Sequence, residues 1–235
     1  MYQASLGSIS GQGNPQLMQQ SLGEQAYQQL RQMIVRLDFA PGDVLREDEL
    51  RARLDVGRTP LREALQRLAR EHFVTVIPRR GMFVSGIDVS ELSMLFETRT
   101  VLEPYAARLA ATRGDDGHWT AMDAALAHTA DPELDAEGLL RLDRTCHEVM
   151  WAAAGNRFLV DTLDMLYAQS DRLWHLYVAD VADLAEAVTE HRAILDALRA
   201  ADGERAAELV EAHVRSFDEQ IRAAVTDRLA SPLAG

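Results

Sequence analysis

Three histidines and one aspartate in the C-terminal half of the chain have a spacing that suits a metal site. Asp143 and His147 lie four residues apart in a segment that predicts a helix, so their side chains share one helical face. His191 and His213 lie equally far in sequence from position 202, where an Asp-Gly pair predicts a break between two helices. If those helices fold back as an antiparallel pair, the two histidines face each other. All four side chains are then expected to reach one ion.

Three imidazoles and one carboxylate form a sound ligand set for a divalent metal. Imidazole suits zinc, nickel, copper and iron, and a carboxylate extends the choice to manganese. Zinc is the expected ion, with nickel, manganese or iron as alternatives. The ligands must be neutral histidine and ionised aspartate, so affinity is expected to fall in acid. The ordinary alternative, a core or surface role for each histidine by itself, is outweighed by the convergence of four residues under one hairpin.

The remaining histidines and the single cysteine are weaker candidates. His175, in the stretch SDRLWHLY, is a candidate for lining a pocket, with packing in the core as its alternative. His118 and His128 lie near predicted helix ends and are interpreted as surface residues. Cys146 points about 100° away from His147 around the helix, which favours a buried apolar role over metal ligation.

A second set of polar side chains repeats along a helix in the N-terminal half. Thr59 and Pro60 predict its start, as the N-cap and the first helical residue, and it runs to about position 72. Leucine and alanine side chains occupy one side of it, while Arg58, Arg62 and Gln66 repeat every four residues on another. Arginine bonds guanine bidentately and glutamine pairs with adenine, so this stripe is typical of a helix that enters the major groove of DNA.

Two neighbouring features extend this candidate nucleic-acid surface. The hydroxyl of Thr59 and the exposed amides at the helix start suit a phosphate group. Arg79 and Arg80 lie at the predicted tip of a β-hairpin, where they are expected to reach the DNA backbone or the minor groove. The alternative for the stripe alone is an ordinary amphipathic helix with solvated arginines.

The predicted elements have the order of a winged helix-turn-helix followed by a helical bundle. An S-x-x-E capping box at 21–24 opens the first helix, a short helix covers 47–54, and strands at 74–77 and 82–85 flank the turn at 78–81. The bundle helices are predicted at 89–112, 117–129, 134–154, 157–179, 182–201 and 203–229. The expected fold class is therefore mainly α. It divides into a disordered arm at 1–20, a winged helix-turn-helix domain at 21–87 and an all-helical bundle of about six helices at 88–230.

The charge distribution separates these two parts of the 235-residue chain. Its net charge is −13, yet residues 1–87 hold 11 arginines against 9 acidic residues, and residues 88–235 hold 13 against 28. The acidity belongs to the second part and does not exclude DNA binding by the first. No apolar run approaches the ~18–20 residues of a membrane span, and the N-terminus has no secretory signal pattern. With a single cysteine, these features predict a cytoplasmic protein without a membrane partner.

The stretch GRTPLREALQRLAREHFVTVIPRRGMFV resembles the DNA-binding domain of GntR-type bacterial transcription regulators, and the resemblance covers about 22–87. It implies that Arg58, Thr59 and Arg62 contact operator DNA and that Arg80-Gly81 forms the tip of the wing. The sequence has Asp48 where some members carry a DNA-contacting arginine. Arg51, one turn further on, is the candidate substitute.

The second half resembles the all-helical effector domain, often called FCD, of the FadR-like branch of these regulators. The resemblance covers about 89–228 and rests on ETRTVLEPYAARLAA, DRTCHEVMWAAAGN, EHRAIL and EAHV. It implies that the Asp and three His bind metal. Arg99 is a candidate for holding a carboxylate of the effector, with a salt bridge to Glu103 as its alternative. Asn156 is a candidate hydrogen-bond donor to the effector, with capping of a helix as its alternative.

Together these patterns and the resemblance predict a homodimeric, ligand-responsive transcription regulator, and the resemblance implies a repressor as the expected type. It would bind an inverted repeat in double-stranded operator DNA and sense a small organic acid at the metal. One rival is a regulator in which the ion itself is the signal, and another is a regulator whose pocket holds no metal. The third is a metal-dependent enzyme, which is disfavoured because Glu148, the nearby acid by sequence, faces away from His147.

Overall fold

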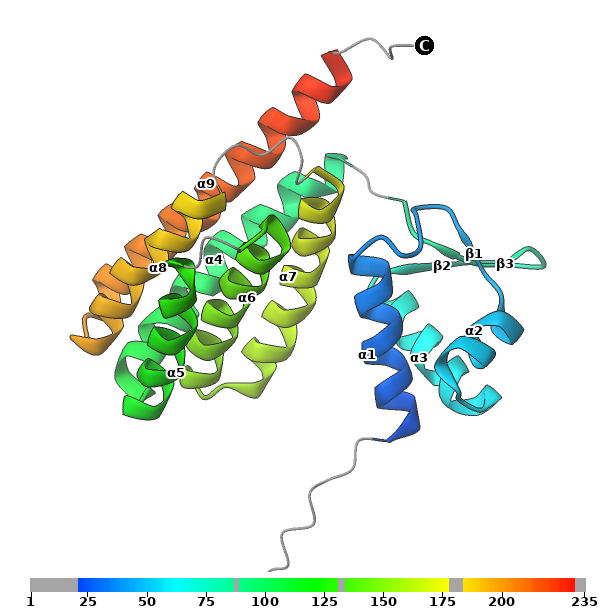
Figure 1. Ribbon diagram of the computed structural model, residues 1–235, viewed down its shortest axis with the longest axis horizontal. Helices are drawn as coiled ribbons and strands as arrows, with labels where there is room; N and C mark the ends of the chain where they lie inside the picture. The colour runs from blue at the N-terminus through cyan, green and yellow to red at the C-terminus, as the bar shows by residue number, and fades with distance from the viewer. Residues whose placement is uncertain (1–20, 87–88, 131–133, 178–183, 231–235) are drawn as a thin grey trace, which may run out of the picture.

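The computed structural model describes residues 21–86, 89–130, 134–177 and 184–230, and the predicted disordered arm at 1–20 lies outside these ranges. The described chain forms two units, a winged helix-turn-helix at the N-terminal end and a helical bundle after it (Figure 1). Each unit has a buried apolar cluster of its own. The predicted fold class, mainly α with these two kinds of unit, is confirmed.

The N-terminal unit packs three helices against a small sheet. The helices are α1 (Leu22–Val35), α2 (Glu47–Leu54) and α3 (Arg58–Arg70). Ser21 accepts a hydrogen bond from the Glu24 amide at 3.1 Å, as the predicted N-cap should. α3 begins earlier than predicted, with Gly57 and not Thr59 at its N-cap. Pro60 then falls inside the first turn, where a missing N–H costs no helical hydrogen bond.

The sheet contains one strand that the sequence did not indicate. Strands β2 (Val74–Ile77) and β3 (Gly81–Val84) form the predicted hairpin, and β1 (Val44–Leu45) adds to the other edge of β3 in the order β1-β3-β2. Two residues are too few to show an alternating pattern, so β1 is set by its pairing with β3 and not by a local signal. At the hairpin turn Gly81 has φ +109°, a conformation that favours glycine.

The C-terminal unit is built from helices that lie close to the predicted ranges. They are α4 (Val89–Arg113), α5 (Asp116–Ala127), α6 (Ala136–Ala153), α7 (Arg157–Tyr177), α8 (Leu184–Arg199) and α9 (Gly203–Ala230), with a 3-10 turn η1 (His128–Ala130) after α5. α4 runs unbroken through Pro104 and lies along α9, and α8 folds back on α9 (Figure 1). None of the helices in the described residues is long and apolar enough to cross a membrane.

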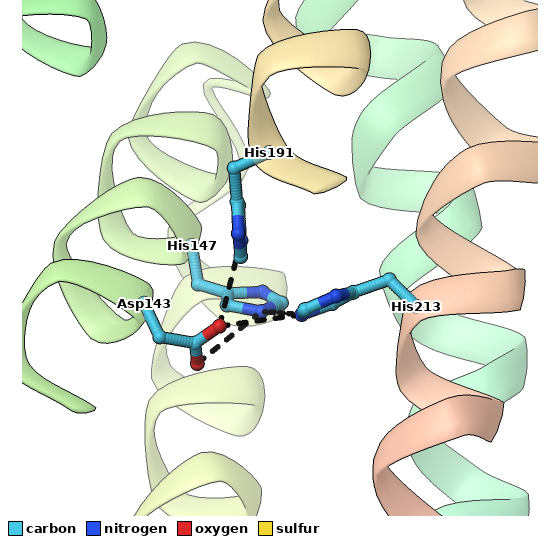
Figure 2. Close-up of side chains that lie close together, drawn as sticks. All are labelled: Asp143, His147, His191 and His213. Atoms are coloured by element: carbon cyan, nitrogen blue, oxygen red, sulfur yellow. Dashed lines mark hydrogen bonds and ion pairs between the residues drawn. The ribbon is translucent and has the colours of Figure 1, made fainter. Parts of the chain in front are cut away.

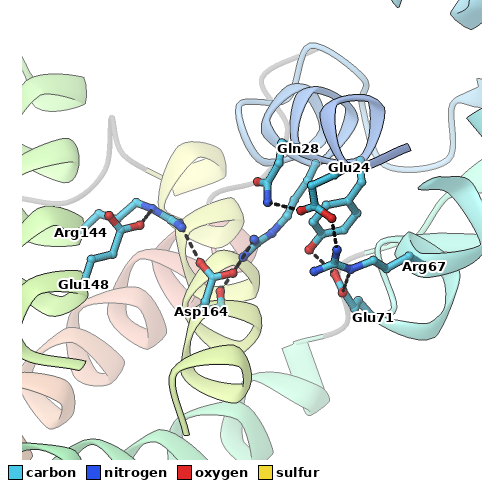
Figure 3. A network of polar contacts seen from close by, with 9 residues as sticks. Glu24, Gln28, Arg67, Glu71, Arg144, Glu148 and Asp164 are labelled. Carbon is cyan, nitrogen blue, oxygen red and sulfur yellow. Dashed lines mark hydrogen bonds and ion pairs between the residues drawn. The ribbon is translucent and has the colours of Figure 1, made fainter. Parts of the chain in front are cut away.

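Helix α7 connects the bundle to the N-terminal unit through a short ladder of polar contacts. From α1, Arg31 donates to the Asp164 carboxylate and to its backbone oxygen, both at 2.6 Å. The other carboxylate oxygen of Asp164 accepts from Arg144 of α6 at 2.6 Å (Figure 3). Further along α7, Gln169 donates to the backbone oxygen of Glu71 at 2.6 Å. One carboxylate on α7 therefore ties α1 and α6 together.

We expect Asp164→Asn to lower the free energy of unfolding by about 1–2 kcal/mol near pH 7. Burial raises the pKa of Asp164, but Arg31 and Arg144 hold it below its ordinary value. A carboxyl with a lowered folded pKa stabilises the fold above its unfolded pKa of about 3.9, and loses that contribution as the pH falls through the folded value. The difference between wild type and variant should therefore persist down to about pH 5 and shrink below about pH 4.

Urea denaturation across this pH range measures the difference. Asp161→Asn, at an exposed position one turn earlier on α7, is the matched control and should stay near wild type. An equal loss in both variants, or a loss in Asp164→Asn that is independent of pH, would contradict the role of the ion pair.

Candidate metal centre

The four predicted ligands converge inside the bundle. Asp143 and His147 extend from adjacent turns of α6, His191 from α8 and His213 from α9 (Figure 2). Each offers one ligand atom, and these atoms all lie within 4.8 Å of one another. All four residues are at most 2% exposed. The antiparallel pairing of α8 and α9 brings His191 and His213 together, with ring centroids 4.5 Å apart and the rings edge to face.

The distances within the cluster suit a small divalent ion. The Nε2 atoms of His147 and His213 are 3.2 Å apart, and Asp143 Oδ1 lies 3.3 Å from His213 Nε2 and 3.7 Å from His191 Nε2. Asp143 Oδ2 lies 3.8 Å from His147 Nε2. Ligands at ~2.0–2.2 Å from a tetrahedral ion would be about 3.3 Å from each other. The donor atoms are therefore already near the separations that an ion requires.

A second ring of side chains orients the ligands. His147 Nδ1 lies 2.7 Å from Glu103 Oε2, and His213 Nδ1 lies 2.7 Å from Glu190 Oε2. A carboxylate on Nδ1 fixes the imidazole so that Nε2 faces the ion. The Tyr167 hydroxyl donates to Asp143 Oδ2 at 2.5 Å. The sequence reasoning missed the roles of Glu103, Glu190 and Tyr167, although an acid directly before His191 was visible.

The electrostatics of the cluster show what the ion would replace. Burial alone raises the pKa of Asp143, but His147, His213 and His191 hold it well below its ordinary value. Burial lowers the pKa of His213, but Asp143 and Glu190 raise it to about 9. The carboxylates thus need positive charge beside them. A divalent cation bound by neutral histidines would supply that charge in place of protons.

Arg99, the predicted effector contact, lies next to this second ring. Its Nε donates to Glu103 Oε1 at 2.6 Å, so the predicted alternative, a salt bridge, is present in the structure. Burial raises the pKa of Glu103, but Arg99 and His147 lower it to about 2. Nη1 of Arg99 is buried without a hydrogen-bond partner among the described residues. The guanidinium therefore keeps one free donor, and its effector role stays a prediction.

The other two predicted effector contacts lie away from the ligand cluster. Asn156 Oδ1 accepts from the amides of Phe158 and Leu159 at 3.2 and 3.4 Å. It therefore caps α7, which is the alternative role that the sequence predicted. It precedes Tyr167 by about 16 Å of helix. His175 lies about 12 Å beyond Tyr167 on the same helix. It lines a different cavity, of about 350 Å³, between α1, α6 and α7.

Cys146 and the aromatic side chains next to the predicted ligands have roles in packing. Cys146 is fully buried in the apolar core, and burial raises the pKa of its thiol. The rings of Trp151 and Tyr167 contact His147 at tilted angles, and that of Phe217 contacts His213 in the same way. These contacts place an aromatic wall beside the ligands.

The predicted DNA-binding residues are exposed on the N-terminal unit, except for Arg51. α3 buries Leu61, Ala64, Leu65 and Leu68 and exposes Arg58, Thr59, Arg62 and Gln66. At the wing, the turn exposes Arg79, Arg80 and Gly81. Arg51 is half-buried on α2, with Nη1 3.6 Å from Asp48.

One acidic side chain organises the arginines of α3. Glu47 of α2 accepts from Arg62 Nε at 3.0 and 3.1 Å and lies 3.9 Å from Arg58 Nε. Sequence reasoning missed this contact, which holds both guanidinium groups at the start of the helix. The two arginines remain more than half exposed, so they are available to a partner.

Comparison with known proteins agrees with both halves of this description. Residues 22–84 match the family model described as bacterial regulatory proteins of the gntR family, and residues 94–216 match the FCD domain. The Nta operon transcriptional regulator of Aminobacter aminovorans is 32% identical over 200 residues, which cover 83% of this chain and 94% of that protein. The transcriptional repressor RspR of Escherichia coli is 27% identical over 205 residues, which cover 86% and 90%.

A solved structure has the same arrangement of both units. E. coli McbR/YncC aligns with a TM-score of 0.76 at 21% identity, covering 89% of this chain and 99% of that chain. At this identity the likeness concerns the fold. The relatives named here are transcription regulators and not enzymes, which agrees with the expectation from the sequence. The chain therefore belongs to the GntR family of bacterial transcription regulators, in the FadR-like branch that carries an FCD domain.

Proposed function

We propose that this DNA-binding regulator is a repressor that senses a small organic acid bound at a divalent metal in the FCD domain. The observation that carries the proposal is the buried cluster of Asp143, His147, His191 and His213 in the same chain as an exposed arginine helix. Zinc is the proposed ion, and nickel, manganese or iron would suit the same ligands. A regulator of this kind acts where the chromosome lies, so the cytoplasm remains the expected location.

The chemistry around the ligands supports a carboxylic acid as the effector. Four protein ligands leave a coordination position free if the ion is five- or six-coordinate. The free Nη1 donor of Arg99 lies next to the second ring of the site, and a guanidinium is a preferred partner for a carboxylate. Aromatic side chains supply an apolar wall. An acid held by both the ion and Arg99 fits this arrangement.

A homodimer is proposed from the exposed surface of α4. Met94, Val101 and Tyr105 are 58%, 67% and 51% exposed, and their spacing of seven and four residues puts them on one face. Single exposed apolar residues are ordinary, but an apolar stripe along a helix is typical of an interface. A two-fold dimer would match an inverted repeat in double-stranded operator DNA.

Repression relieved by the effector is the proposed direction of control. The E. coli relative RspR is itself described as a repressor. The effector can change DNA affinity only if it binds one arrangement of the dimer better than the other. The second candidate function, a metal-ion sensor, is favoured by the completeness of the buried ligand set. In that case operator affinity would follow the metal concentration and ignore organic acids.

Purified protein is expected to hold close to one equivalent of metal per chain, and His213→Ala is expected to lose it. Metal that binds only the folded state stabilises it by RT ln(1 + [M]/Kd), about 2.7 kcal/mol at a hundredfold excess over Kd. Elemental analysis and denaturation with and without a chelator measure both effects. Exposed His128 provides the matched control, because His128→Ala should retain the metal.

The second ring gives a milder version of the same test. Glu190→Gln keeps the size of the side chain but removes the carboxylate on His213 Nδ1. Loss of such a partner costs about 10- to 100-fold in metal affinity. If His213→Ala still holds a full equivalent of metal with wild-type stability, the proposed site is wrong.

Arg62→Ala is expected to weaken operator binding by about 10- to 100-fold, because a bidentate base contact is worth about 1–3 kcal/mol. The measurement is a gel shift with the intergenic DNA beside the gene for this protein. Arg215→Ala, an exposed arginine on α9 in the other unit, is the control and should bind like wild type. If neither apo nor metal-loaded wild type shifts this DNA in the gel, the DNA is not the operator.

Val101→Glu is expected to convert the dimer into monomers in sedimentation experiments, since it places a charge in the centre of the apolar stripe. Phe158→Glu is the matched control, because Phe158 is equally exposed, at 68%, but lies on α7. If the dimer tolerates Val101→Glu and dissociates with Phe158→Glu, the interface does not lie on α4.

A further inference from the structure

A second cavity lies where the two units meet, and it is separate from the metal ligands. Its volume is about 280 Å³. Its walls come from the end of α3, the segment after β3, the start of α4, and α7. The lining is mostly apolar and includes Leu92, Leu95, Met165, Leu166 and Leu173. Both units thus contribute to the walls of one mostly apolar cavity.

One cationic side chain on the wall of this cavity has no counter-ion in the described part of the chain. Arg172 of α7 is 1% exposed and lines the cavity. Its Nη2 donates to the backbone oxygen of Ser85 at 2.5 Å, but its Nε is buried without a hydrogen-bond partner. Among the described residues Arg172 forms no ion pair, and burial lowers the pKa of its guanidinium to about 10.

The acidic residues of the cavity do not compensate this charge. Glu71 is already engaged by Arg67 at 3.0 Å and by the Tyr27 hydroxyl at 2.7 Å. Glu91 is exposed on α4. By contrast, the neighbouring buried Arg31 and Arg99 each have a carboxylate at 2.6 Å. Within the described ranges, Arg172 therefore differs from the buried Arg31 and Arg99, because its acceptor is a backbone carbonyl and not a carboxylate.

A buried guanidinium in an apolar chamber has a defined chemical preference. A charge removed from water is strongly disfavoured unless an opposite charge or a full set of hydrogen bonds compensates it. Carboxylate is the group that the planar guanidinium fork matches best. The leucine and methionine side chains around it favour an apolar body on the same molecule. Polar acids without such a body gain little from these walls.

We propose that this junction cavity is a second ligand site, which takes a monocarboxylic acid with a medium-sized apolar tail. The carboxylate pairs with Arg172, and the tail packs on Met165, Leu166 and Leu95. Because α3 and the segment after the wing form part of the wall, a bound acid contacts both units at once. It would bias how the DNA-binding unit is held against α7, independently of the metal centre.

Octanoate is the probe that tests this site, with titration calorimetry on the full-length, metal-loaded protein. Octanoate is expected to bind, whereas octanamide, which lacks the charge, and acetate, which lacks the tail, should bind at least tenfold more weakly. Arg172→Met should weaken octanoate at least tenfold. Met165→Trp fills the cavity without touching the charge, so it should have the same effect.

Two further variants separate this site from the metal centre and from general effects. Arg157→Met removes an exposed arginine from the same helix and should leave octanoate affinity unchanged. His213→Ala, which is expected to lose the metal, should still bind octanoate like wild type. Circular dichroism shows whether Arg172→Met and Met165→Trp retain a folded bundle, whether or not metal is bound. If either of them loses the fold, the other carries the test.

Three results would overturn the proposal. In the first, wild type fails to bind octanoate at millimolar concentration. In the second, octanoate binding is lost in His213→Ala and kept in Arg172→Met, which places the acid on the metal. In the third, octanamide binds as well as octanoate, which removes the role of the Arg172 charge. None of these results depends on whether the metal centre senses an acid, so the two proposals fail separately.

Discussion

The arrangement of the bundle depends on the need to compensate one buried carboxylate. Asp143 is 1% exposed in the centre of the C-terminal unit, and an ionised group at that depth requires positive charge and hydrogen-bond donors close to it. Histidines from α6, α8 and α9 and the hydroxyl of Tyr167 from α7 meet this need. Glu103 of α4 supports one of the histidines. Five helices therefore place side chains around a single charge, and their relative positions are coupled through it.

Helix α7 contacts both the buried cluster and the DNA-binding unit. Tyr167 contacts Asp143 of the buried cluster, while Asp164 and Gln169, each within one turn of Tyr167, contact α1 and the end of α3. Ala168 is part of the apolar core of the N-terminal unit. A short stretch of α7 therefore joins the buried cluster to both neighbours within about two turns of helix. The network in Figure 3 continues from Asp164 through Arg144 to Glu148 on α6.

Charge is divided between the units in a way that suits their separate partners. The arginines at the start of α3 and at the wing tip are exposed, and Glu47 holds Arg58 and Arg62 in place without covering them. The excess of acidic residues lies in the bundle. Salt screens charges over short distances, so these acids do not cancel the positive field of the exposed arginines. The acidic net charge of the chain is therefore compatible with DNA binding by its N-terminal unit.

Much of this protein follows from the sequence by itself. Helical periodicity and turn residues predicted the helices of both units, since an amphipathic pattern and its breaks are local properties. The pairing of His191 with His213 also followed, because two positions equally far from a helical turn must meet when the hairpin closes. The stripe of Arg58, Arg62 and Gln66 could be recognised because residues that repeat every four positions share one side of a helix. The start of α3 was misplaced by two residues, because Gly57 left no side-chain signal for a cap.

Only the tertiary structure decided which residues from distant elements meet. β1 exists because β3 offers an edge, and two residues hold no pattern from which to predict it. Glu103 and Tyr167 join the Asp143 cluster because α4 and α7 pack against α6. The angle at which two helices pack depends on both partners, so the sequence of one helix does not predict it. Asn156 and His175 lie on the helix that carries Tyr167 but too far along it to share its site. Likewise, only the folded structure shows that Arg172 is buried without a counter-ion among the described residues. A local pattern cannot show whether a charged side chain finds a partner once it leaves water.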